Sequence, residues 1–245
     1  MVWIKICGIT EIDDAKQTAA AGADALGFIL STDSPRRIGE EKLMSIISGL
    51  EKLSLSPVKS QVPLKPDLRQ VEYKVTAVPS FVGVFVNEEP ERIIGLINRN
   101  LIDFVQLSGV EDREYIEKIK GTKKSIKVIK LLRISSDTNR ESVCRQMNKL
   151  KSCTDFFLLD TYSENALGGT GRTFEWHLVE NIGLDFPVIL AGGLDSSNVD
   201  QALEIVKPFG VDASSGLESY PGRKDINKTR DFIEKVRSFE KALLR

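Results

Sequence analysis

The chain contains 245 residues, and its 34 basic and 35 acidic residues leave a formal net charge of only −1. Such a balance argues against a nucleic-acid-binding surface, and no apolar stretch is long enough to span a membrane, so neither partner is expected. The three cysteines form no CxxC pair and the single histidine leaves no metal cluster of the usual spacing. We therefore expect a cytoplasmic protein without a bound metal.

Along the chain, short apolar runs alternate with amphipathic helical segments about eight times, which is the rhythm of a parallel sheet. Most of the runs are rich in β-branched or aromatic residues, as is typical of strands that are covered on both faces. The expected strands are residues 3–7, 25–30, 81–86, 104–107, 126–132, 156–160, 188–191 and 211–214.

Helix signals lie between these strands. We expect Thr10 with Asp13 to open a helix over residues 12–21, Pro90 to start one that runs to residue 98, and Gly121 to close one that begins near residue 112. Eight strand–helix units predict a single-domain (β/α)8 TIM barrel over residues 1–245. An open doubly wound sheet is the alternative, but no GxGxxG motif follows the first strand.

Residues 53–80 interrupt this rhythm between the second helix and the third strand, and they are too long for an ordinary helix-to-strand loop. The segment contains four prolines, and residues 71–76 alternate like an edge strand. A helix-to-strand connection lies on the bottom face of a barrel, so we expect an inserted loop away from the substrate. The alternative is an oligomer contact, as in a homodimer.

Two side chains at strand ends are candidates for catalysis. Residues 3, 5 and 7 share one face of the first strand, and Cys7 is its last side chain before a glycine. Asp160 ends the sixth strand in the same way, and Asp212 is a weaker rival for the role of acid. Ligands bind at the carboxyl ends of parallel strands. A buried core thiol and a turn-forming carboxylate are the simpler alternatives.

Three glycine-rich clusters follow the last three strands. Glycine lets backbone N–H groups approach an anion closely, and hydroxyl side chains add donors. Because loops after strands seven and eight of a barrel often bind phosphate, the clusters together predict a phosphorylated small substrate. Each cluster alone also fits an ordinary turn. The candidate phosphate-binding residues are Gly169, Gly171, Gly192, Gly193, Ser214, Ser215 and Gly216.

The loop after the second expected strand reads SPRRI at residues 34–38 and contains a candidate carboxylate-binding residue, Arg36. A guanidinium is fork-shaped and suits a planar carboxylate. The alternative is a solvated loop cation, the usual fate of a surface arginine.

Nearly end to end, the chain resembles the phosphoribosylanthranilate isomerase family of tryptophan biosynthesis. The motifs that carry the resemblance are KICGIT (5–10), GADALGF (22–28), SPR (34–36), VGVFVN (82–87), VQL (105–107), LLDT (158–161), GGTGRTF (168–174), AGGL (191–194) and DASSGLE (212–218). The resemblance implies a (β/α)8 barrel that converts N-(5-phosphoribosyl)anthranilate into the corresponding 1-deoxyribulose 5-phosphate without a cofactor. It further implies that Cys7 is the general base, Asp160 the general acid and Arg36 the anchor of the anthranilate carboxylate.

The chain departs from the family pattern at two positions. Ser108 stands where the family usually has histidine, and Arg172 where it often has lysine. Neither change touches the implied acid and base, although a role for that histidine cannot be transferred. One alternative function is that of a non-catalytic phosphosugar-binding barrel. Another is that of a different phosphosugar isomerase, but such an enzyme would have a carboxylate in place of Cys7 and would show two half-barrel repeats.

If Lys5 and Cys7 both point into the barrel, the positive charge of Lys5 is expected to favour the thiolate form of Cys7.

Overall fold

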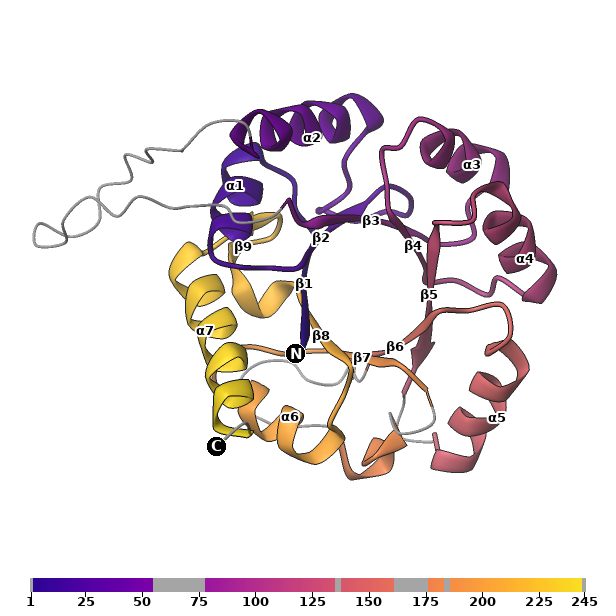
Figure 1. The fold of residues 1–245 in the computed structure, drawn as a ribbon, viewed down its shortest axis with the longest axis vertical. Coiled ribbons are helices and arrows are strands. Elements are labelled where there is room, and N and C mark those ends of the chain that lie inside the picture. Colours follow the sequence, from indigo (N-terminus) through magenta and orange to yellow (C-terminus); the bar gives the residue numbers. More distant parts are fainter. Residues whose placement is uncertain (1, 55–77, 135–137, 161–175, 183–185, 244–245) are drawn as a thin grey trace, which may run out of the picture.

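The computed structural model describes residues 2–54, 78–134, 138–160, 176–182 and 186–243. Eight parallel strands close a barrel in chain order, with the eighth strand paired to the first, which confirms the predicted fold. Figure 1 shows the strands as a central ring and the helices as an outer layer around it. The strands are β1 (Trp3–Cys7), β2 (Ala25–Ile29), β3 (Ser80–Phe85), β4 (Phe104–Leu107), β5 (Lys127–Arg133), β6 (Phe156–Asp160), β7 (Val188–Ala191) and β8 (Gly210–Ala213).

The outer layer consists of helices whose apolar faces pack on the barrel. Within the described ranges they are α1 (Ile12–Ala20), α2 (Glu40–Ser54), α3 (Pro90–Asn98), α4 (Arg113–Thr122), α5 (Arg140–Leu150), α6 (Val199–Val206) and α7 (Ile226–Leu243). Between β6 and β7 the described residues form a short 3₁₀ helix, η1 (Trp176–Val179), and not an α-helix. The described chain therefore shows seven α-helices where the sequence predicts eight.

Two of the predicted helix signals are wrong. Thr10 does not cap α1, because its hydroxyl donates to the Gly222 carbonyl at 2.5 Å and the cap position is Glu11. Gly121 does not close α4, which ends one residue later at Thr122. At its other end α4 begins as expected, since the Asp112 side chain accepts a hydrogen bond from the backbone N–H of Tyr115 at 2.9 Å.

Strand alternation divides the core into two layers. Ile4 and Ile6 of β1 point outward into the large core between strands and helices, whereas Lys5 and Cys7 point inward. A smaller core fills the barrel itself, with members such as Val82, Ile129, Leu158 and Ile189. Packed aromatic rings close the amino-terminal end, and their neighbouring centroids lie 4.9–6.5 Å apart in the set Trp3, Phe104, Phe156 and Phe209. Packing therefore fills the bottom of the barrel and leaves the polar inward residues toward the carboxyl ends.

The predicted insertion over residues 53–80 is described only at its borders. Residues 53 and 54 belong to α2, and Ser80 begins β3, so the connection runs from a helix end to a strand start. Residues 55–77, including the expected edge strand at 71–76, lie outside the described residues. In the described part of the chain, no helix is long and apolar enough to cross a bilayer.

A small antiparallel hairpin follows β8 and bears on the site. It consists of β9 (Glu218–Tyr220) and β10 (Arg223–Lys224), and a short 3₁₀ helix, η3 (Ser215–Leu217), connects it to β8. Figure 1 shows β9 between α1 and α7. Hydrogen bonds agree with this placement, since the Lys224 N–H donates to Asp14 of α1 at 2.9 Å and Lys228 of α7 donates to the Glu218 carbonyl at 3.0 Å.

Candidate active site

A cavity of about 250 Å³ opens among the carboxyl ends of the strands. It brings together all of the predicted site residues that the structure describes, although they come from five regions of the chain. These residues are Cys7, Arg36, Asp160, Gly192, Gly193, Asp212, Ser214, Ser215 and Gly216. Gly169 and Gly171 lie outside the described residues, so their predicted place beside the phosphate stays a prediction.

Cys7 occupies the end of β1 and faces into the barrel, as the alternation of the strand predicts. Its neighbour across the β1–β2 pairing is Gly27. A β-carbon at Gly27 would lie only 2.8 Å from Cys7 Sγ and 2.9 Å from Lys5 Cε. Glycine at this position therefore makes the room that lets the thiol and the lysine lie side by side.

Lys5 and Asp212 form a buried ion pair directly below Cys7. The distance from Lys5 Nζ to Asp212 Oδ2 is 2.7 Å, and the Lys5 side chain is 0% exposed. Burial by itself lowers the pKa of Lys5, but the nearby Asp212 and Cys7 raise it overall, so Lys5 stays protonated. Asp212 Oδ1 has no hydrogen-bond partner among the described residues.

The thiol of Cys7 is subject to two opposing effects. Burial raises its pKa above the ordinary value of 9.0, because the charged thiolate is poorly solvated in the barrel. The positive charge of Lys5 acts in the opposite direction and is the largest influence that favours the thiolate. The predicted pairing of these two residues is thus present, but the effect of burial on the thiol pKa is larger than that of Lys5.

Asp160 lies at the end of β6 and lines the same cavity as Cys7. Burial is the main cause of the raised pKa of Asp212, and the carboxylate of Asp160, when it is ionised, adds to the shift. Both carboxyl groups line the cavity, but Asp212 is buried and paired with Lys5, whereas Asp160 is only partly buried. This arrangement favours Asp160 over Asp212 for contact with a ligand.

The turns after β7 and β8 contribute glycine and serine to the cavity. Gly192 and Gly193 both have positive φ, at 92° and 66°, a conformation that glycine adopts without strain. Ser214 donates its hydroxyl hydrogen to the Cys7 carbonyl at 3.0 Å, which ties the end of β8 to the end of β1. Its hydroxyl is therefore committed to the protein, and Ser215 is the remaining serine of this turn.

Arg36 lines the cavity from the loop after β2, but it is not a solvated cation. Its Nε and Nη2 donate to the two carboxylate oxygens of Glu218 at 2.8 and 2.7 Å. Lys224 donates to the same carboxylate at 3.0 Å. Neither Glu218 nor Lys224 was predicted as a site residue, because Arg36 and Glu218 are 182 residues apart and such a pair leaves no local pattern.

Gln106 is a further polar residue of the cavity that the sequence analysis missed. It lies on β4 and is 4% exposed, and its Nε2 donates to Ser108 Oγ at 3.2 Å. Its carbonyl oxygen has no hydrogen-bond partner within the described ranges. A polar side chain between Val105 and Leu107 in a buried strand was the available signal.

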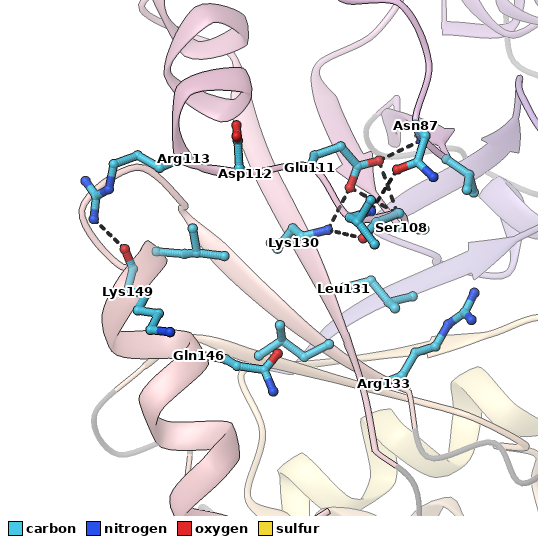
Figure 2. A pocket seen from close by; sticks show the side chains of 15 residues that line it. Asn87, Ser108, Glu111, Asp112, Arg113, Lys130, Leu131, Arg133, Gln146 and Lys149 are labelled. Carbon is cyan, nitrogen blue, oxygen red and sulfur yellow. Dashed lines mark hydrogen bonds and ion pairs between the residues drawn. The ribbon is translucent and has the colours of Figure 1, made fainter.

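A larger cavity of about 960 Å³ lies beside the first, over the carboxyl ends of β4 and β5, and Leu131 lines both. Figure 2 shows Lys130 pointing toward Glu111, with a distance of 2.7 Å from Nζ to Oε2. Glu111 also accepts hydrogen bonds from the backbone N–H groups of Asn87 and Gly109. Ser108 lines this second cavity and accepts the hydrogen bond from Gln106, which lines the first.

Comparisons with known proteins agree on one family. The family model described as "N-(5'phosphoribosyl)anthranilate (PRA) isomerase" matches residues 55–235. A relative from Geobacter sulfurreducens, named N-(5'-phosphoribosyl)anthranilate isomerase, is 36% identical over 239 residues, covering 98% of this chain and 100% of the relative.

Solved structures give the same result. The phosphoribosyl anthranilate isomerase from Thermotoga maritima superposes with a TM-score of 0.75 at 36% identity, covering 97% of this chain and 100% of that one. A phosphoribosyl anthranilate isomerase in complex with reduced 1-(o-carboxyphenylamino)-1-deoxyribulose 5-phosphate has a TM-score of 0.70 at 33% identity, with the same coverage. The chain therefore belongs to the N-(5'-phosphoribosyl)anthranilate isomerase family.

Proposed function

We propose that this protein catalyses the Amadori rearrangement of N-(5'-phosphoribosyl)anthranilate to 1-(2-carboxyphenylamino)-1-deoxyribulose 5-phosphate in tryptophan biosynthesis. The observation that carries the proposal is the shared cavity of Cys7 and Asp160 in a barrel of this family. The rearrangement needs one acid and one base, and these two side chains supply both.

The proton transfers follow from the chemistry of an aminoaldose. Asp160 gives a proton to the ring oxygen, the C1'–O bond breaks, and the nitrogen lone pair forms an iminium. Cys7 as thiolate then takes the proton from C2', and the electrons of that C–H bond move to give an enolamine. Protonation at C1' and loss of the enol proton complete the aminoketose, so the reaction is an isomerisation that consumes nothing else.

Lys5 supports this role of Cys7. Its positive charge is the largest influence that favours the thiolate, and its ion pair with Asp212 holds it in place. A thiol whose pKa is raised by burial also binds a proton strongly once it has taken it. Asp212 thus acts through Lys5 in this proposal, instead of as the acid.

The phosphate group is proposed to bind at the turns after β7 and β8. Gly192, Gly193 and Gly216 allow backbone N–H groups to approach an anion, and Ser215 adds a hydroxyl donor. Binding energy at this non-reacting end orients the sugar between Cys7 and Asp160. The resemblance adds Gly169 and Gly171 to this set.

We further propose a cytoplasmic homodimer. The location is supported by the absence of disulfides among the three cysteines, all of which are free. The dimer is supported by a Thermotoga maritima relative that is described as dimeric.

The deciding experiment mixes the purified protein with N-(5'-phosphoribosyl)anthranilate and measures the loss of anthranilate-type fluorescence over time. Turnover in the unsubstituted protein and its loss in both Cys7→Ser and Asp160→Asn support the isomerase. Binding of the substrate without turnover would instead identify a phosphosugar-binding barrel and reject the proposal.

A further inference from the structure

We propose that Glu218, together with Lys224, is a positioning pair that aims the free edge of the Arg36 guanidinium into the cavity as a preformed carboxylate site. The inference rests on the proposed function, because the carboxylate is that of the anthranilate ring. It assigns a role to the β9–β10 hairpin, which carries both residues of the pair.

The geometry of the Arg36–Glu218 pair leaves one edge of the guanidinium unused. A guanidinium is a planar fork with donors along two edges. Glu218 occupies the edge formed by Nε and Nη2, at 2.8 and 2.7 Å. Nη1 makes no hydrogen bond within the part of the chain described, so the edge formed by Nη1 and Nη2 can still donate to a second carboxylate.

Arg36 reaches the cavity from the loop after β2. It lines the cavity together with Cys7, and although its hydrogen bond to Glu218 is the main reason that the pKa of Arg36 is raised, the negative charge of a Cys7 thiolate adds to the shift. The side chain crosses directly over Gly8, where a β-carbon would lie 2.7 Å from Arg36 Cδ. Gly8, with φ of 75°, therefore permits the arginine to lie against the turn after β1.

The charges of the cluster add up to one unpaired positive charge. Arg36 and Lys224 are cations and Glu218 is an anion, and the two members of the pair are almost fully buried, with side chains 4% and 2% exposed. Burial by itself raises the pKa of Glu218, but Arg36 and Lys224 lower it overall, which keeps the carboxylate ionised. A substrate carboxylate would complete a neutral group of two cations and two anions.

The pair is fixed to the scaffold at several points. Lys224 Nζ donates to the Ser214 carbonyl at 3.1 Å as well as to Glu218, and its backbone N–H donates to Asp14. These bonds link the hairpin to the end of β8 and to α1. Arg36 is 21% exposed, yet its guanidinium is held by a buried and anchored partner, so its orientation is set before ligand arrives.

The opposite interpretation is that Glu218 blocks Arg36. A carboxylate bound to arginine would then compete with the substrate, and removing its charge would improve binding. The two interpretations predict opposite signs for the same substitution, which makes them separable.

The test compares four proteins: Glu218→Gln, Arg36→Met, the double variant, and Glu234→Gln, which removes an exposed carboxylate on α7 as a matched control. Each is measured with N-(5'-phosphoribosyl)anthranilate and with the aniline analogue that lacks the carboxylate. The readout is the ratio of the two kcat/KM values, so a general loss of activity cancels. Circular dichroism and thermal unfolding confirm the fold of each variant.

We expect Glu218→Gln to reduce the preference for the carboxylate substrate by about tenfold, mainly through KM, the effect of one hydrogen bond to a charged group. The double variant should show the same preference as Arg36→Met alone, because Glu218 acts only through Arg36. A preference that is unchanged or higher in Glu218→Gln, or losses that add in the double variant, would overturn the inference.

A binding measurement keeps the inference testable without turnover. Equilibrium affinity for reduced 1-(o-carboxyphenylamino)-1-deoxyribulose 5-phosphate is compared with affinity for its phenylamino counterpart in Glu218→Gln and in the control. Absence of turnover in the unsubstituted protein rejects the isomerase. A carboxylate preference that survives Glu218→Gln in binding rejects the positioning role alone.

Discussion

Lys5 Nζ lies 2.7 Å from Asp212 Oδ2. Lys5 is on the inward face of β1, two positions before Cys7. The pair is buried, so the lysine cannot exchange its partner for water, and its charge is fixed beside the thiol. Removal of one partner of a buried ion pair leaves the other charged and unsolvated, which costs about 3–5 kcal/mol. Substitution of Lys5 is therefore expected both to lower the stability of the barrel and to change the protonation of Cys7, the candidate base.

The first prediction concerns the titration of Cys7. Burial raises the pKa of the thiol above 9.0 and Lys5 opposes that shift, so Lys5→Met is expected to raise the pKa further. Because only the thiolate reacts, alkylation of Cys7 by iodoacetamide should begin at higher pH in the variant. The alkaline rise of kcat/KM should move in the same direction. Mass spectrometry of the Cys7 peptide across a pH series measures the first effect.

Lys42→Met is the matched control, because Lys42 is an exposed lysine paired with Glu11 at the surface. Its alkylation profile should coincide with that of the unsubstituted protein. An unchanged Cys7 profile in folded Lys5→Met would mean that the lysine does not set the charge of the thiol.

The second prediction concerns the two proposed proton carriers. Cys7→Ser should lower turnover by about 10²- to 10⁴-fold, because an alkoxide forms far less readily than a thiolate. Asp160→Asn should lose turnover but keep substrate affinity, since the amide cannot donate to the ring oxygen. Single-turnover assays together with equilibrium binding measure both. Cys144→Ser on α5 is the control, and activity within about threefold of the unsubstituted protein in Cys7→Ser would remove the thiol from the base role.

The barrel and most of its strand ends could be predicted from local signals. Period-two alternation places Cys7 inward, and the order of apolar runs places Asp160 at the end of β6, because both depend only on neighbouring residues. Arg36 and Glu218 are 182 residues apart in sequence, and their pairing depends on barrel closure. No local pattern reports such a pair.

A tertiary contact also explains one of the two failed helix signals. Thr10 has the right residue type for a cap, but the Gly222 carbonyl of the hairpin turn takes its hydroxyl at 2.5 Å. Gly121 carries a helix-ending signal, yet α4 continues to Thr122. In both cases the local signal lies within about two residues of the observed boundary, which is the usual precision of a helix end.

The third prediction tests the proposed phosphate turn. Gly193 has φ of 66° with no atom within 4 Å of an added β-carbon, so Gly193→Ala clashes with no described neighbour but strains the backbone. The strain costs about 1–2 kcal/mol of unfolding free energy and displaces the N–H groups of the turn. The inhibition constant of inorganic phosphate against substrate should therefore increase.

Gly95→Ala in α3 is the control, because its added β-carbon also meets open space and its backbone is helical. It should leave phosphate inhibition unchanged. Phosphate inhibition that is equally strong in Gly193→Ala would place the anion elsewhere.

The final prediction concerns Gln106, whose buried carbonyl oxygen has no partner among the described residues. A buried acceptor without a partner costs free energy, so its removal offsets the loss of the Gln106–Ser108 hydrogen bond, and the similarly sized Gln106→Met should change the unfolding free energy by less than about 1 kcal/mol. If the carbonyl accepts a hydrogen bond from the substrate, KM should nevertheless rise by about 2- to 10-fold. Steady-state kinetics and chemical denaturation of the same preparation measure the two effects.

Gln146→Met, on the wall of the neighbouring cavity, is the control and should change neither the KM nor the unfolding free energy. If the KM stays constant in Gln106→Met while the unfolding free energy increases, the Gln106 carbonyl oxygen faces no donor on the substrate. The only effect of the substitution would then be to remove a buried acceptor that has no partner among the described residues.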